Sequence, residues 1–164
     1  MRKTKRNEQG RQLDRIDRHI LRTLQSNGRI SFVELGEKVG LSTSPCLERV
    51  RRLEQAGYIK GYTAIMNPKL LEAGLLVYVE ISLEYTSPDI FEQFRDAVRL
   101  MPQVLECHLV SGSFDFLLKV RIADIAAYRA LLGEILHGLP GVRDSRSYVV
   151  MEEVKETLSL DISP

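Results

Sequence analysis

The 164-residue sequence lacks the features that mark membrane and secreted proteins. Its longest uninterrupted apolar stretch, residues 75–79, is far shorter than the roughly 20 residues that cross a bilayer. Charged residues at 14–18 follow the basic N-terminus where a cleaved secretory signal would have an apolar segment. The two cysteines, Cys46 and Cys107, form no CxxC pair, so we expect no disulfide framework and a cytoplasmic location.

Common catalytic and metal-binding motifs are also missing. The sequence contains no GxGxxG, P-loop or GxSxG motif, and no serine lies in a recognisable nucleophile setting. Cys107 and His108 are adjacent, but no second Cys/His pair stands at ligand spacing. We therefore expect no metal, no cofactor and no enzymatic activity.

Charge is distributed unevenly along the chain although the net charge is only +1. Residues 1–66 hold 14 basic and 7 acidic side chains, whereas residues 67–164 hold 9 and 15. A basic half joined to an acidic half suggests two domains with different partners. The basic half is the candidate for binding nucleic acid.

The basic half reads as three helices followed by a short hairpin. Apolar residues with helical spacing predict the first helix, which ends at Asn27-Gly28. Ser31 and Glu34 have the spacing of a capping box and predict a second, short helix that ends before Gly40. The apolar residues of the first helix are Leu13, Ile16, Ile20, Leu21 and Leu24.

The third helix begins at a run of hydroxyl residues. Either Ser42 or Ser44 can cap it, because Pro45 is tolerated only in a first helical turn. Cys46 lies on its apolar face, which indicates a small core residue. Residues 58–65 predict a small hairpin, or wing, that turns at Gly61.

Two short helices joined by a glycine-containing turn are typical of a helix-turn-helix, whose second helix enters the DNA major groove. Hydroxyls at a helix start bind phosphate, and arginine can bind guanine through two hydrogen bonds. The alternative is a solvated face in which Glu48 pairs with Arg52. The predicted double-stranded DNA contacts are Ser42, Thr43, Ser44, Glu48, Arg49, Arg51 and Arg52.

The acidic half contains an internal repeat. Residues 101–104 (MPQV) match residues 139–142 (LPGV) at a shift of 38 positions. Each copy reads as strand, helix, strand, which gives the order βαββαβ of a ferredoxin-like domain. The expected strands are 75–85, 104–110, 114–121 and 142–154.

A four-stranded sheet with both helices on one face leaves its other face uncovered. We expect apolar residues on that face to be buried against a partner sheet, so the protein should be at least a dimer. The fold class is therefore α+β, a winged helix-turn-helix (three helices plus a short β-hairpin) followed by a ferredoxin-like βαββαβ domain.

Four segments make the chain similar to a known family: LDRIDR (13–18), PCLERVRRLE (45–54), ECHLVSG (106–112) and YVVMEEVK (148–155). They resemble the Lrp/AsnC family of bacterial transcription regulators. The resemblance implies an amino-acid-responsive C-terminal domain, an effector such as leucine, and dimers that assemble into octamers or hexadecamers on DNA. By position, the family's response residues correspond to Leu109, Gly112, Asp115, Ile125, Tyr148, Val149 and Val150.

Some of these residues also have structural interpretations. Gly112 can serve a hairpin turn, Asp115 can cap that turn, and the aliphatic side chains can belong to the core. In the effector interpretation, Asp115 pairs with an α-ammonium group and Gly112 allows close approach of a ligand. Ser113 stands where close relatives usually carry aspartate, and Ile125 where they have methionine, so the identity of the ligand is open.

The expected function is a sequence-specific DNA-binding transcription regulator that responds to a small amino acid and is associated with the nucleoid. The alternative is a DNA-architectural protein whose C-terminal domain only oligomerises. The expected domains are a basic arm (1–12), the helix-turn-helix domain (13–66), a linker (67–74), the ferredoxin-like domain (75–155) and a C-terminal tail (156–164).

Overall fold

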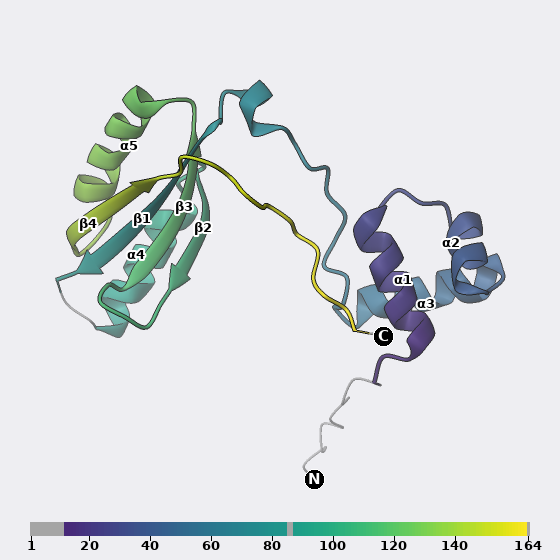
Figure 1. The fold of residues 1–164 in the computed structure, drawn as a ribbon. Coiled ribbons are helices and arrows are strands. Elements are labelled where there is room, and N and C mark those ends of the chain that lie inside the picture. Colours follow the sequence, from purple (N-terminus) through teal and green to yellow (C-terminus); the bar gives the residue numbers. More distant parts are fainter. Residues whose placement is uncertain (1–11, 85–86, 164) are drawn as a thin grey trace, which may run out of the picture. The chain divides into compact units, whose positions relative to one another are not determined.

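The computed structural model of the chain describes residues 12–84 and 87–163 (Figure 1). It divides into two compact units: an N-terminal unit of Met1–Ile65 with Glu156–Pro164, and a C-terminal unit of Met66–Lys155. The predicted basic arm lies, except for Gln12, outside the described residues. In chain order the elements are α1 (Arg15–Ser26), α2 (Phe32–Val39), α3 (Thr43–Gln55), the 3-10 helix η1 (Pro68–Leu71), β1 (Leu75–Leu83), α4 (Pro88–Arg99), β2 (Val104–Leu109), β3 (Phe116–Ile122), α5 (Ile125–Gly138) and β4 (Val142–Val149).

The helices of the N-terminal unit begin at reciprocal side-chain caps. The predicted capping box of α2 is confirmed, because Ser31 accepts a bond from the Glu34 amide and the Glu34 carboxylate accepts one from Ser31. A second capping box, not predicted, starts α1 between Asp14 and Asp17. Of the two candidates for the cap of α3, the structure uses Ser42, whose carbonyl accepts the Cys46 amide.

Two glycines shape the turn between α2 and α3. Gly40 ends α2 in the left-handed conformation, with φ of 73°. Gly36, inside α2, is buried, and a Cβ there would lie 2.7 Å from the Leu41 carbonyl oxygen. The turn therefore packs directly on the backbone of α2 at Gly36. The core of this unit, which includes Cys46 as predicted, consists of Ile20, Leu21, Leu35, Val39, Cys46, Val50 and Leu53.

The predicted hairpin at residues 58–65 is wrong in this structure. No residue of that segment is in a strand, although every one of them is described. The amides of Tyr58 and Ile59 donate to the Leu53 carbonyl at the end of α3, so they are not available for pairing across a turn. Tyr62, beyond Gly61, donates its hydroxyl to Glu54 instead. Tyr58 and Ile59, which were expected to start the first strand of the wing, thus bind the C-terminal end of α3.

The C-terminal tail packs on the N-terminal unit. The Gln25 side chain exchanges two hydrogen bonds with the Leu160 backbone, at 3.0 and 2.7 Å. Arg18 donates to the Ser163 carbonyl, and Ile162 packs against the helical core. The chain therefore passes between its two units twice, once near residue 66 and again near residue 155.

Ile162→Ala is expected to lower the free energy of unfolding of the N-terminal unit by about 1–2 kcal/mol, because it removes packed methylene groups from a half-buried position. Leu160→Ala is the matched control. The Leu160 side chain is 76% exposed, so its loss should change stability by less than about 0.5 kcal/mol. Hydrogen exchange of α1 amides in the full-length protein measures both. Equal effects of the two changes would contradict the packing of Ile162.

The C-terminal unit is the predicted ferredoxin-like fold. Its four-stranded sheet has the order β2-β3-β1-β4, and every neighbouring pair is antiparallel. The 38-residue repeat is visible in this arrangement, because β2 and β4 both begin two residues after a proline that follows a helix. The last strand is shorter than predicted and ends at Val149. The Val150 amide makes one further hydrogen bond to the Leu76 carbonyl of β1 beyond that end.

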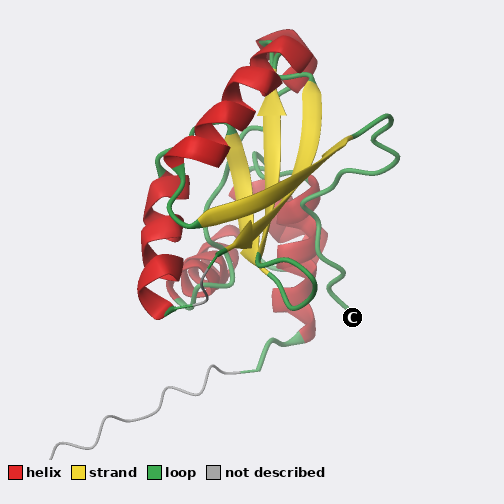
Figure 2. Cartoon of the chain, turned by 90° about the vertical axis from the view of Figure 1, so that its left-hand side faces the viewer, coloured by secondary structure: helices red, strands yellow, loops and turns green. Residues whose placement is uncertain are grey.

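Both helices of this unit pack on the same face of the sheet (Figures 1 and 2). The alternate residues of β1 from Val77 to Leu83 are buried there, as the sequence predicts. In α5, Leu131 is buried and Leu132 is only partly buried, while Ile125 is 55% exposed at the start of the helix. The helix residues that complete this core are Phe94, Val98, Tyr128, Leu131 and Ile135.

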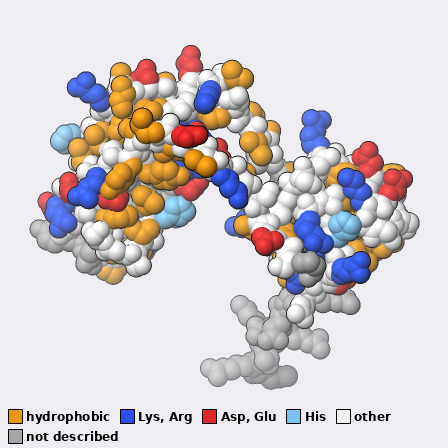
Figure 3. Space-filling model, in the orientation of Figure 1, with side chains coloured by type: hydrophobic (Ala, Val, Ile, Leu, Met, Phe, Trp, Pro, Cys, Tyr) orange, Lys and Arg blue, Asp and Glu red, His pale blue; other side chains and the backbone are white. Residues whose placement is uncertain are grey.

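The opposite face of the sheet is less apolar than expected. The register places Tyr78 between Lys119 and Tyr148 on that face, and Glu80 lies beside them. Glu106 bonds both His108 and Lys119, and these two bonds lower the pKa of its carboxyl group. Hydrophobic side chains lie interspersed with charged ones on the part of this unit visible in Figure 3.

Candidate DNA-binding and effector sites

The first turn of α3 presents the predicted hydroxyl groups to solvent. Ser42, Thr43 and Ser44 are all exposed, and the Ser42 side chain makes no capping bond. Glu48 and Arg51 are exposed further along the helix. Arg51 makes no ion pair or side-chain hydrogen bond within residues 12–84 and 87–163. This surface is therefore free to contact a ligand outside the chain.

The other two arginines of α3 are engaged inside the N-terminal unit. Arg49 lies 2.6 Å from the Asp14 carboxylate and 2.8 Å from that of Asp17. Arg52 lies 2.6 Å from Asp17, so its partner is not Glu48, which is the pairing that the sequence suggested. The hydrogen bond from Arg49 lowers the pKa of the Asp14 carboxyl group. The sequence gives no signal for these pairs, because they join residues more than 30 positions apart.

Three predicted effector residues lie where β2 turns into β3. Leu109 ends β2 and is 52% exposed, and Gly112 lies in the turn. Asp115 is integrated into the sheet: its carboxylate accepts a 2.8 Å hydrogen bond from the Leu83 amide, and its own amide donates to Ile81. The Asp115 side chain therefore binds the end of β1 and does not cap the turn, which was the structural role suggested by the sequence. Its second carboxylate oxygen makes no hydrogen bond within the described residues.

The remaining four predicted effector residues lie at the other end of the sheet. Ile125 begins α5, and Tyr148 and Val149 end β4, with Val150 next to them. A 2.5 Å hydrogen bond between Tyr128 and Ser147 shows that the first turns of α5 lie against the end of β4. Tyr148, 45% exposed, donates its hydroxyl to Glu80.

A single chain does not bring these two groups together. In the register of β1 and β3, Phe116 lies opposite Ile81 and Ile122 lies opposite Leu75. Asp115 binds the Leu83 amide, whereas Val149 lies opposite Val77, six positions earlier on β1, so roughly 20 Å along the sheet separates the two groups. The structure splits the predicted effector site into a turn group (Leu109, Gly112, Asp115) and a strand-end group (Ile125, Tyr148, Val149, Val150).

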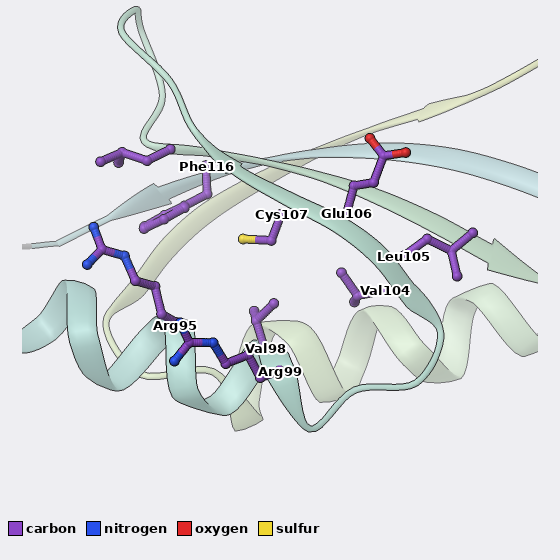
Figure 4. Close-up of a pocket in the computed structure, with 9 residues that line it drawn as sticks. Arg95, Val98, Arg99, Val104, Leu105, Glu106, Cys107 and Phe116 are labelled. Atoms are coloured by element: carbon purple, nitrogen blue, oxygen red, sulfur yellow. The ribbon is translucent and has the colours of Figure 1, made fainter. Parts of the chain in front are cut away.

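A cavity of about 350 Å³ lies between α4 and the edge strand β2 (Figure 4). Apolar side chains including Val98, Val104 and Phe116 line it, and Arg95 and Arg99 line the side formed by α4. Cys107 points into it, and burial raises the pKa of this thiol. Leu109 is the one predicted effector residue among its lining residues. The sequence analysis did not identify this cavity, because the residues of α4 and β2 that form it carry no common motif.

Residues 12–84 and 87–163 contain no group of three or more His, Cys, Asp or Glu side chains placed to hold a metal ion. No helix within the same residues is long and apolar enough to cross a membrane.

Family comparisons match both units. Residues 13–60 match a winged helix-turn-helix DNA-binding model, and residues 76–160 match the Lrp/AsnC ligand binding domain. The leucine-responsive regulatory proteins of Klebsiella pneumoniae and Escherichia coli K12 are each 62% identical to this chain over 153 residues, which is 93% of either chain. The matches are to regulators, a family that is not known for enzymatic activity.

Solved structures agree with this grouping. A transcriptional regulator from Neisseria meningitidis, determined as a complex with L-methionine, is 39% identical and covers 91% of this chain and 96% of its own, with a TM-score of 0.86. An AsnC family regulator from Agrobacterium tumefaciens is 36% identical and covers 91% and 97%, with a TM-score of 0.87. The chain therefore belongs to the Lrp/AsnC family of DNA-binding, effector-responsive transcription regulators.

Proposed function

We propose that this regulator recognises specific DNA sequences through α3 and responds to a small amino acid such as leucine. The observation that carries the DNA-binding part is the exposed hydroxyl cluster at the start of α3, with Arg51 exposed further along the same helix. Leucine is favoured because the relatives that are 62% identical are leucine-responsive regulatory proteins, and methionine is the next candidate because the Neisseria regulator binds it.

In this proposal α3 enters the major groove. Hydroxyls and backbone amides at a helix start bind phosphate, so Ser42, Thr43 and Ser44 would anchor the helix on the DNA backbone. Arg51 would contact a base edge, and Glu48 would accept a bond from a cytosine amino group. Arg49 and Arg52 flank this surface while they stay paired with α1. A protein that binds chromosomal DNA in this way would be associated with the nucleoid.

The split of the predicted effector residues favours a site built by more than one copy of the chain. The turn group supplies a carboxylate and a glycine, and the strand-end group supplies aliphatic side chains. Because about 20 Å separates the two groups in one chain, one amino acid can contact both only if each group comes from a different protomer. We infer a homo-oligomer, with dimers that assemble into an octamer or a larger state.

DNA binding should depend steeply on salt and should respond to leucine. If a dimer neutralises about eight phosphates, the logarithm of affinity falls with the logarithm of salt concentration at a slope near −7. Fluorescence anisotropy measures this with full-length protein, a duplex obtained by in vitro selection, and a scrambled duplex of equal length. A flat salt dependence, or a selection that enriches no sequence, would exclude the proposed DNA recognition.

Asp115→Asn is expected to weaken leucine binding at least about tenfold, because it removes a charged partner for the α-ammonium group. The amide oxygen can still accept the Leu83 amide, so the fold and DNA affinity should be retained. Isothermal titration calorimetry with leucine measures the change. Asp96→Asn, which removes an exposed carboxylate from α4, is the control. Unchanged leucine affinity in Asp115→Asn would remove Asp115 from the site.

The architectural alternative makes a different prediction. If the C-terminal unit only oligomerises, no member of a panel of amino acids should change oligomeric state or DNA affinity. Light scattering coupled to size exclusion, with and without each amino acid, tests this directly. A ligand-dependent change in assembly would favour the sensor and would identify its effector.

A further inference from the structure

Asp17 is the one buried carboxylate in the described part of the chain, with 4% of its surface exposed. Burying a carboxylate costs free energy unless cations and hydrogen-bond donors compensate for lost hydration. Two arginines of α3 provide that compensation: Arg49 at 2.8 Å and Arg52 at 2.6 Å, both on the same carboxylate oxygen. Asp14 binds Arg49 as well, so the cluster holds two negative and two positive charges and is neutral.

Capping of α1 does not account for this carboxylate. The cap depends mainly on Asp14, whose side chain accepts a 2.8 Å bond from the Asp17 backbone amide. The Asp17 carboxylate adds one long bond of 3.4 Å to the Asp14 amide. Its short bonds go instead to α3, the helix that carries the proposed DNA contacts. The negative charge of Asp17 therefore holds α3 against α1 through Arg49 and Arg52.

We propose that Asp17 is a positioning residue that sets the specificity of DNA recognition, an inference that rests on the proposed function of α3. By holding Arg49 and Arg52 against α1, Asp17 withholds two of the three arginines of α3 from DNA phosphates. Arg51 is left as the arginine of α3 that contacts DNA. Free arginines would bind phosphates of any sequence, since phosphate contacts carry no sequence information. The ion pairs of Asp17 with Arg49 and Arg52 thus limit non-specific affinity for DNA, and they fix the orientation in which α3 approaches the DNA.

Asp17→Asn tests this role, because it keeps the shape of the side chain while removing its charge. The expected result is tighter binding to a scrambled duplex and at least a tenfold smaller ratio of specific to non-specific affinity. If both released arginines reach phosphates, the non-specific salt slope steepens by about 0.9 for each, or about 1.8 per bound α3. A change that merely damaged the fold would weaken binding to both duplexes.

Asp14→Asn is a second, milder variant that guards against loss of folding. Asparagine caps helices as well as aspartate, so α1 keeps its cap while Arg49 loses its exposed partner. The non-specific slope should steepen by at most about 0.9 per α3. Asp96→Asn, which removes an equal charge from the exposed ion pair with Arg99 in the other unit, should leave both affinities unchanged.

The measurement uses full-length protein, a duplex selected in vitro with wild-type protein, and a scrambled duplex of the same composition, at several salt concentrations. Unchanged or equally weakened binding of both duplexes by Asp17→Asn and Asp14→Asn would overturn the role of Asp17. Wild-type protein that does not distinguish the two duplexes would instead reject the proposed function itself.

Discussion

Gly36→Ala is expected to destabilise the N-terminal unit by about 1–3 kcal/mol, although helix propensity alone predicts the opposite. Alanine in a helix interior is favoured over glycine by about 1 kcal/mol. At this position, however, the new Cβ would lie 2.7 Å from the Leu41 carbonyl oxygen, closer than real Cβ atoms approach. That oxygen belongs to the turn that positions α3 relative to α2. Relief of the clash therefore has to move the backbone between these two helices.

Gly133→Ala in α5 is the matched control for this prediction. A Cβ at Gly133 would meet nothing within 4 Å, so propensity decides and the change should stabilise the C-terminal unit by about 0.5–1 kcal/mol. Hydrogen exchange in the full-length protein separates the two units, and duplex binding reports the geometry of the turn. If the α2 amides of the Gly36→Ala protein keep their protection from hydrogen exchange and its DNA affinity is normal, the close approach of Gly36 to the Leu41 carbonyl would be contradicted.

Arg51→Ala is expected to weaken binding of the selected duplex about tenfold to a hundredfold, because a specific arginine–base contact contributes about 1–3 kcal/mol. Stability should not change, since Arg51 is exposed and its guanidinium makes no ion pair or hydrogen bond within the described residues. Arg29→Ala, which removes another exposed arginine of the same unit that lies outside the proposed DNA contacts, is the control and should leave affinity for the selected duplex unchanged.

The neighbouring Arg52→Ala should behave in the opposite way. It removes one of two cations from buried Asp17 and should cost about 1–2 kcal/mol of stability, because Arg52 is partly exposed and Arg49 remains. Urea denaturation followed by hydrogen exchange of α1 amides, together with anisotropy titrations, compares the two variants. A selective loss of duplex affinity in Arg52→Ala at unchanged stability would show that Arg52, too, contacts DNA.

Local patterns in the sequence determined much of the fold. Helix starts were predictable where a side chain binds a backbone amide three residues away, as at Ser31 and Glu34. The alternation of apolar side chains along β1 was informative because a strand buried on one face has apolar residues at every second position. The repeated MPQV and LPGV segments predicted the ferredoxin-like order of the elements. The hairpin at 58–65 was not predictable in this way, since its first amides close α3 instead of pairing across Gly61.

Only the tertiary structure decided which residues of the predicted sites are available and which lie together. Arg49 and Arg51 are both predicted DNA contacts, but the fold places Arg49 beside buried Asp17 and leaves Arg51 exposed. The same holds for Asp115 and Ile125, which the register of the sheet places near opposite ends. Side-chain periodicity reports the neighbours of a residue along its own helix or strand. Contacts between residues distant in sequence depend on how the elements pack, and that information is absent from any local pattern.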